Sequence, residues 1–123
     1  MPRKDESAIQ DLLPLQAVMF HMLLLLSEGE RHGYALKREM AKRTSGKLNP
    51  GPGVLYGAIN KMIEQGLIVE SDERPASHLD DERRRYYRIT PFGRRVAQAE
   101  AVRMRELVEM AEANIGLPEP ARG

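Results

Sequence analysis

Apolar residues recur at helical spacing in four segments of the chain. These segments are 12–27, 33–46, 52–65 and 91–113. A glycine ends or follows each of the first three, and a proline opens each of the last two. The first segment, with Asp11 as its expected cap, is apolar around much of its circumference. Such a helix is buried on more than one face.

Two short segments between the third and fourth helices have the composition of strands. Residues 67–71 and 85–89 are rich in β-branched and aromatic residues and predict an antiparallel hairpin, joined by a polar loop over 72–84. The order helix, helix, turn, helix, strand, loop, strand, helix is typical of a winged helix-turn-helix domain. The predicted fold class is therefore mainly α with a small β-hairpin, plus a C-terminal dimerisation helix.

The same pattern predicts a domain organisation. Residues 1–11 are polar and are predicted to be a flexible N-terminal segment, and residues 12–90 form the winged helix-turn-helix domain. Residues 91–114 form the dimerisation helix, because a domain this small buries a limited core and its first and last helices carry surplus apolar surface. Residues 115–123, which contain two prolines, are predicted to be a disordered tail.

The composition argues against several function classes. The 123 residues include no cysteine, which excludes thiolate catalysis and cysteine-based metal sites. The three histidines have no ligand or triad spacing, so no enzyme, metal or cofactor is expected. His78 with Asp80 and Asp81 is a conceivable metal site, but solvated loop acids are far commoner. The apolar run 17–26 is too short to cross a bilayer, and no secretory signal precedes it, so a cytoplasmic protein is expected.

Basic residues are concentrated in two blocks, although the net charge is only +1. Residues 31–61 and 83–95 each carry a net charge of +6, whereas residues 62–82 carry −6. Clustered positive charge indicates a polyanion-binding surface. On charge alone, solvated helix faces are the commoner explanation, so the positions of the blocks in the fold decide between the two.

The third predicted helix turns a face of small and polar residues away from the core. A helix fits the major groove of DNA, and its N-terminal residues reach the base edges. Tyr56 is a phosphate contact or a packing residue with nearly equal weight, and Asn60 is an adenine contact or, more safely, a surface residue. The candidate DNA-binding residues here are Pro52, Gly53, Val54, Tyr56, Asn60 and Lys61.

Basic residues of the second helix and the wing would contact phosphates, which position a protein on DNA without reading sequence. They are Lys37, Arg38, Lys42, Arg43 and Lys47, with Arg83, Arg84 and Arg85 in the wing. Arg38 would otherwise pair with Glu39 or Glu30. The acidic run 80–82 directly precedes the wing arginines, so these acids either pair with them or point away from DNA.

Several motifs in this order resemble the PadR family of transcriptional regulators. They are His32-Gly33-Tyr34-Ala35-Leu36, Pro52-Gly53-Val54-Leu55-Tyr56, Glu64-Gln65-Gly66-Leu67-Ile68, and Arg85-Tyr86-Tyr87-Arg88-Ile89-Thr90 with Gly93. The resemblance runs from Leu12 to Ala111. By position, it implies a core-packing role for Tyr34 and a DNA-facing role for Tyr56. Val54 stands where the family often has Ser or Thr, which removes a hydroxyl donor.

The resemblance implies a homodimeric repressor that binds double-stranded DNA at a palindromic operator. The last helix of one subunit would pack on the first helix of the other, through Leu15, Met19, Met22, Val96, Ala99, Leu107 and Met110. A small-molecule effector is a further candidate partner, with Met19, Met22 and Met104 as pocket lining or, more commonly, as core residues. The alternative function is a winged-helix protein–protein interaction module without DNA binding, which needs an apolar exposed face.

Overall fold

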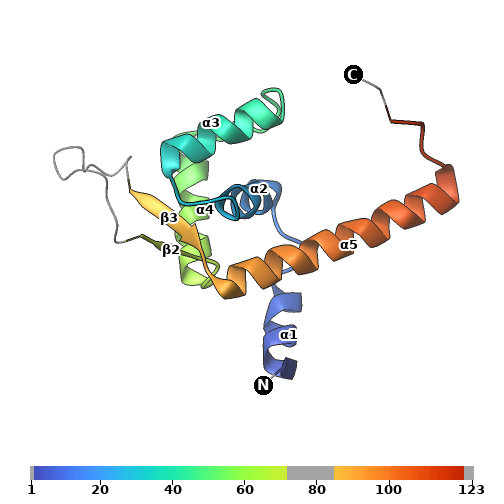
Figure 1. The fold of residues 1–123 in the computed structure, drawn as a ribbon, viewed down its shortest axis with the longest axis horizontal. Coiled ribbons are helices and arrows are strands. Elements are labelled where there is room, and N and C mark those ends of the chain that lie inside the picture. Colours follow the sequence, from blue (N-terminus) through green and yellow to red (C-terminus); the bar gives the residue numbers. More distant parts are fainter. Residues whose placement is uncertain (1, 72–84, 121–123) are drawn as a thin grey trace.

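Helices form most of the molecule, and a small antiparallel sheet lies on one side of them (Figure 1). The computed structural model describes residues 2–71 and 85–120, with side chains from residue 5 onward. In these residues the elements are α1 (Pro2–Asp11), α2 (Ala17–Leu26), β1 (Arg31–His32), α3 (Gly33–Arg43), α4 (Pro52–Glu64), β2 (Ile68–Glu70), β3 (Tyr86–Ile89) and α5 (Pro91–Ile115). The prediction of a mainly α fold with a small β-hairpin is confirmed. No helix of the described ranges combines the length and apolar character that crossing a membrane requires.

The centre of the domain is α2, which contacts α3, α4, α5 and β3. Its Met22 and Leu23 have no exposed surface. Because neighbours cover α2 on several sides, nearly every residue in it is apolar. The other fully or almost fully buried apolar side chains include Leu36, Met40, Leu55, Ile59, Met62, Leu67, Ile68, Tyr87 and Val96.

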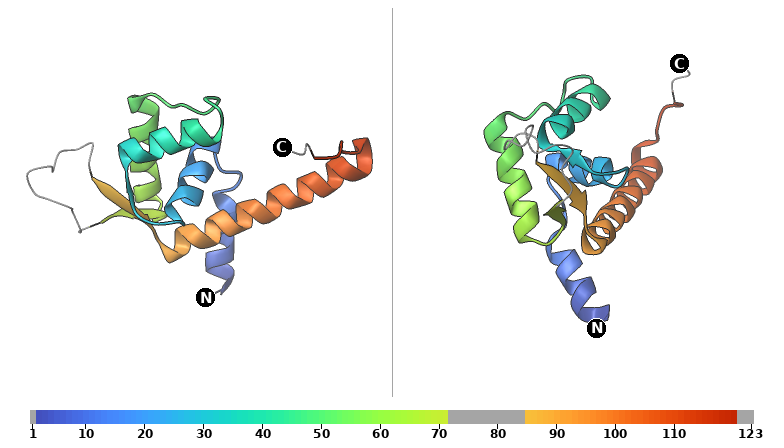
Figure 2. Two further views of the ribbon diagram at one scale, coloured as in Figure 1. Left: turned by 45° about the horizontal axis from the view of Figure 1, so that its top comes forward. Right: turned by 60° about the vertical axis from the view of Figure 1, so that its left-hand side comes forward.

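The N-terminal prediction is wrong in two respects. Residues 1–11 were expected to be flexible, but Pro2–Asp11 form α1, which lies at the end of the molecule opposite α3 (Figure 2). Ile9 is buried, and Leu12 and Leu13 pack against the core at the same helical spacing. The next helix begins at Ala17 rather than at Leu12, with Gln16 instead of Asp11 as its cap.

The sheet has the order β1-β3-β2. Ile68 pairs with Ile89 and Glu70 pairs with Tyr87, so the predicted antiparallel hairpin is confirmed. The third strand, Arg31–His32, pairs with the other edge of β3 and was not predicted. A strand of two residues is too short to show an alternation of apolar and polar positions. It can be recognised only from its pairing with β3.

Helix α5 starts on the domain and then extends beyond it (Figure 1). Thr90 caps its N-terminus, because the Thr90 Oγ1 accepts a hydrogen bond of 2.9 Å from the backbone N–H of Gly93. The buried residues of α5 all lie in its first ten positions and are Gly93, Val96, Ala97 and Glu100. The rest of the helix is therefore available for contacts outside the protomer.

Glu100 is a carboxylate with no exposed surface, at the last point where α5 is buried. The Arg103 guanidinium donates two hydrogen bonds to it, of 2.7 and 2.9 Å, and the backbone N–H of Leu15 donates a third, of 3.3 Å. The bonds from Arg103 lower the pKa of Glu100, and burial opposes this effect only in part. Glu100 therefore ties α5 to the connection between α1 and α2.

Replacement of Glu100 by glutamine is expected to destabilise the fold by about 2 kcal/mol at neutral pH, because hydrogen bonds to a charged group are lost. Since folding lowers the pKa of Glu100, its stabilising effect is complete above the unfolded value of about 4.3 and is lost as the pH falls through the folded value. Urea unfolding at pH 7 and at pH 3 will show a difference between wild type and Glu100→Gln that shrinks in acid. A difference that does not change with pH contradicts this role.

Candidate nucleic-acid interface

Helices α3 and α4 are joined by the short segment 44–51, as in a helix-turn-helix. The Lys37 Nζ donates a hydrogen bond of 2.6 Å to the Asn49 Oδ1 across this turn. Leu55, Ile59 and Met62 hold α4 on the core, as predicted. The opposite face of α4 is exposed and consists of Gly53, Val54, Gly57, Asn60 and Lys61. Because two of these five residues are glycines, side chains fill little space on the outward face of α4.

Tyr56 lies between α4 and the start of α3. Its side chain is half-buried and packs against the core. A Cβ atom added to Gly33 would lie 2.9 Å from the Tyr56 hydroxyl and 3.1 Å from its ring. The glycine thus allows the tyrosine to fill the crossing of the two helices, which favours the packing role over the phosphate contact.

Tyr34 was predicted to be a core residue, and this is wrong. Its side chain is 51% exposed. The buried residues of α3 are Leu36 and Met40, four positions apart, and a residue two positions from Leu36 points to the other side of a helix. The spacing of Tyr34 with Arg38 and Lys42 was the signal that places it on the exposed face.

The basic residues of α3 differ in how far their charge is available. Arg43 makes hydrogen bonds of 2.6 and 2.8 Å to the carboxylate of Glu28 and lies 3.4 Å from Glu39. The Arg43 and Arg31 guanidiniums lower the pKa of Glu28 to about 2, with the Arg43 hydrogen bond as the largest cause. Arg43 therefore fastens the end of α3 to the end of α2.

The other predicted cations of this region are exposed. Arg38, Lys42, Lys47 and Lys61 all have exposed side chains, while Lys37 is partly buried beside Asn49. The guanidinium of Arg38 lies 5.6 Å from the centroid of the Tyr34 ring, rather than against Glu39 or Glu30 as the alternative expected. Arg38 and Lys42 come from α3, Lys47 comes from the turn, and Lys61 comes from the last turn of α4 itself.

The wing is described only at its base. Arg83, Arg84, the acidic run 80–82 and His78 lie outside the described residues. Arg85 is exposed and its guanidinium lies 3.7 Å from Glu70. Arg88, which the sequence reasoning did not select, alternates outward from buried Tyr87 and lies 3.8 Å from Glu30.

His32 caps the N-terminus of α3. Its Nδ1 accepts a hydrogen bond of 3.1 Å from the backbone N–H of Ala35, and its ring meets Tyr86 edge-on at 5.4 Å between centroids. In the ranges that the structure describes, no three residues of the metal-binding types come together as a ligand set. The histidine thus has a structural role at the start of α3.

The predicted dimer residues fall into two groups. Met19, Met22 and Val96 are at most 3% exposed in the protomer, so their assignment to a dimer interface is wrong. Leu15 and Ala99 are half-buried, and Leu107 and Met110 are 49% and 58% exposed. The helical spacing of apolar residues does not distinguish a residue buried in the protomer's own core from one buried between subunits.

One stripe runs along the whole of α5. Its residues follow one another at steps of four and three, the spacing of a helix–helix seam, and are Gly93, Ala97, Glu100, Met104, Leu107 and Ala111. The first three pack on the domain, whereas Met104 and Leu107 are 37% and 49% exposed. The seam therefore continues past the point where the protomer can cover it, and Val108 and Ile115 widen it.

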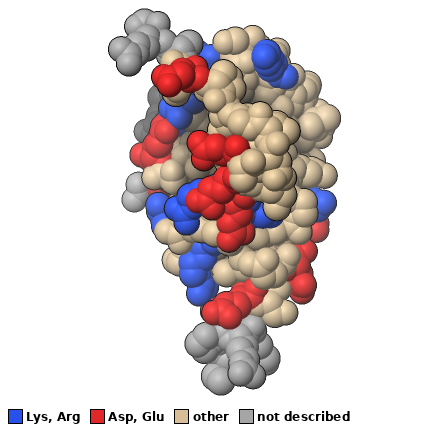
Figure 3. All heavy atoms as spheres, turned by 90° about the vertical axis from the view of Figure 1, so that its right-hand side faces the viewer, with Lys and Arg blue, Asp and Glu red and all other residues tan. Residues whose placement is uncertain are grey.

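The protruding half of α5 is acidic on its other sides. Figure 3 looks at the molecule from the side towards which α5 projects, and acidic side chains gather in the middle of this face. Glu106, Glu109 and Glu112 are all exposed on this part of α5. Residues 104–115 contain three glutamates and one arginine, so this part of α5 has a net negative charge.

These elements define a winged helix-turn-helix domain, and comparison with known proteins adds a family. The profile of the transcriptional regulator PadR-like family matches residues 22–99. The chain belongs to this family of transcriptional regulators. The resemblance in the motifs at His32, Pro52 and Arg85 is therefore confirmed.

Related proteins and structures agree with this assignment. Transcriptional regulator Rv3488 of Mycobacterium tuberculosis is 35% identical over 78 residues, which cover 63% of this chain and 66% of that protein. Two other curated relatives, a protein in transposon TN4556 of Streptomyces fradiae and transcriptional regulator YqjI of Escherichia coli, are much longer, and the chain spans about a quarter of their length, 22% and 25%. A Clostridium thermocellum regulator, Cth-833, has a TM-score of 0.66 at 23% identity, covering 80% of this chain and 89% of that one. A PadR family regulator from Clostridium difficile R20291 has a TM-score of 0.65 at 19% identity, covering 82% and 100%.

Proposed function

We propose that this protein binds double-stranded DNA as a homodimeric repressor at a palindromic operator. The observation that carries the proposal is the surface of the α3–turn–α4 unit, where α4 has an exposed outward face and all three parts of the unit carry exposed cations. Gly53, Val54, Asn60 and Lys61 would enter the major groove. Arg38, Lys42 and Lys47 would contact phosphates on either side, together with the wing arginines Arg83, Arg84 and Arg85.

The seam on α5 supports the homodimer. Its exposed half, from Met104 onward, has the spacing that packs against another helix. In a twofold dimer, each protruding α5 would meet the same surface of the other subunit. The α4 helices of the two subunits would then face the two half-sites of a palindrome. A small molecule that changes the distance between these helices would relieve repression.

Binding to DNA is expected to weaken steeply with salt, because phosphate contacts release counterions. If each protomer neutralises three or more phosphates, affinity will fall about a thousandfold between 50 and 200 mM salt. Fluorescence anisotropy with a labelled duplex from the region upstream of the protein's own gene measures this. An unrelated duplex of the same length is the control for sequence preference.

The same titration separates the alternative function. A winged helix that serves only as a protein–protein interaction module will bind neither duplex at low salt and micromolar protein. That outcome refutes DNA binding, and weak binding without a salt slope contradicts the assigned phosphate contacts.

A further inference from the structure

Tyr34 and Arg38 form one unit on the exposed face of α3. They are four residues apart, so they lie one above the other on the helix. The Arg38 guanidinium carbon stands 5.6 Å from the centroid of the Tyr34 ring, within the range of a cation–π contact. The tyrosine remains 51% exposed despite this contact. The ring therefore orders the Arg38 side chain at the surface, and Tyr34 itself stays outside the core.

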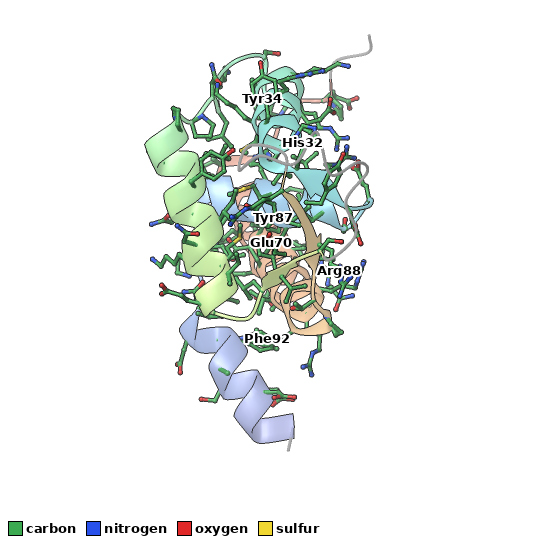
Figure 4. The ribbon with its side chains drawn as sticks, turned by 90° about the vertical axis from the view of Figure 1, so that its left-hand side faces the viewer. His32, Tyr34, Glu70, Tyr87, Arg88 and Phe92 are labelled. Atoms are coloured by element: carbon green, nitrogen blue, oxygen red, sulfur yellow. The ribbon has the colours of Figure 1, made fainter. Side chains whose placement is uncertain are left out.

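This pair lies beside α4 rather than on a remote part of α3. Gly33, the residue before Tyr34, is in contact distance of Tyr56 from α4. One turn further along α3, Lys37 is hydrogen-bonded to Asn49, three residues before α4 begins. In Figure 4, Tyr34 lies at the same end of the molecule as the first turn of α4. Tyr34 is therefore on the part of α3 that lies next to the N-terminal half of α4.

The charge around the pair is suited to an anion. The one acidic residue of α3, Glu39, lies 3.4 Å from Arg43 and thus faces away from Arg38. Lys37 and Lys42 flank Arg38 on the same helix. The positive charge of Arg38 is therefore not neutralised by the acid next to it in sequence.

We propose that Tyr34 and Arg38 together hold a phosphate of the DNA backbone, and that Tyr56 instead maintains the crossing of α3 and α4. The Tyr34 hydroxyl would donate a hydrogen bond to a phosphate oxygen, and the guanidinium of Arg38 would supply the opposite charge. Because the ring already orders the arginine, less side-chain freedom is lost on binding. This inference rests on the proposed DNA binding and reverses the roles of the two tyrosines that the family resemblance implied.

The test compares two matched substitutions that each remove a single hydroxyl. Tyr34→Phe keeps the ring under Arg38, and we expect it to weaken binding about tenfold to both the upstream duplex and the unrelated duplex, because a phosphate contact is independent of sequence. Tyr56→Phe is expected to change affinity by less than about twofold, since its hydroxyl lies over Gly33. Circular dichroism melts will show that both variants are folded.

The arginine is tested by the salt dependence of the same titrations. Arg38→Gln is expected to reduce the slope of log affinity against log salt by about one per protomer. Arg105→Gln, at an exposed position on the protruding α5, is the control and should leave the slope unchanged. The inference is overturned if Tyr34→Phe binds within twofold of wild type, or if its loss is confined to the upstream duplex. Absence of binding by wild type to either duplex overturns the proposed function as well.

Discussion

Gly93→Ala is expected to lower the free energy of unfolding strongly, although it adds a single methyl group. A Cβ atom at this position would overlap the carbonyl oxygen of Leu67 and lie 3.1 Å from the Ile89 Cγ1. That carbonyl accepts a hydrogen bond of 3.0 Å from the Thr90 N–H. If it moved away from the added methyl group, this hydrogen bond, which links the start of β2 to the start of α5, would break. Overpacking of this kind costs about 3 kcal/mol or more, a large part of the stability of a small domain.

Thermal and urea unfolding of the Gly93→Ala variant will measure this loss. Gly57→Ala is the matched control, because Gly57 is also a helical glycine and its added Cβ meets nothing within 4 Å. There the same change should stabilise the protein by about 0.5–1 kcal/mol through the higher helix propensity of alanine. Equal effects at the two glycines would contradict the close approach of α5 to Leu67.

Leu107→Glu is expected to convert the proposed dimer to monomer at micromolar concentration. Leu107 is 49% exposed and lies on the seam of α5, where a second subunit would cover it. Twofold symmetry repeats the substitution, so the apolar contribution of two leucines is lost and two charges are buried. The dimer dissociation constant should rise about a hundredfold or more. Sedimentation equilibrium measures it directly.

Val102→Glu provides the control for this experiment. Val102 is also an exposed apolar residue of α5, at 42%, but helical geometry puts it away from the seam. It should leave the dimer intact and the unfolding of the protomer unchanged. A monomeric wild type at working concentration, or equal effects of the two substitutions, refutes the seam as the interface.

Local signals were sufficient to predict the elements from residue 33 onward. Pro52 opens α4 and Gly66, with a φ of +77°, follows it, because each residue suits a backbone geometry that few others accept. Thr90 caps α5 through its own side chain. Their content of β-branched and aromatic residues located β2 and β3. These features depend on neighbours within about four residues, so the sequence contains the physical information that defines them.

The candidate site was predicted in outline, and its residues were less well assigned. The second helix was correctly identified as the basic one, yet Arg43 proved to be fastened to Glu28, fifteen residues away. The family resemblance implied a core position for Tyr34, which is 51% exposed. It implied a DNA-facing position for Tyr56, which is half-buried between α3 and α4. The spacing of α3 with Leu36 and Met40 would have corrected Tyr34. No local pattern indicates that Tyr56 fills the space above Gly33, since that depends on how two helices cross.

The sequence by itself determined the winged helix-turn-helix order, the positions of most helix ends and the family to which the chain belongs. The tertiary structure decided which apolar residues are buried in the core of the protomer and which remain exposed on its surface. Met22 and Leu107 both follow helical spacing, but the first has no exposed surface and the second is 49% exposed. Hydrophobic spacing reports only that a side chain avoids water. What covers it is settled by the packing of segments that lie far apart along the chain. This is also why α1, in which Ile9 is buried, was visible only in the folded molecule.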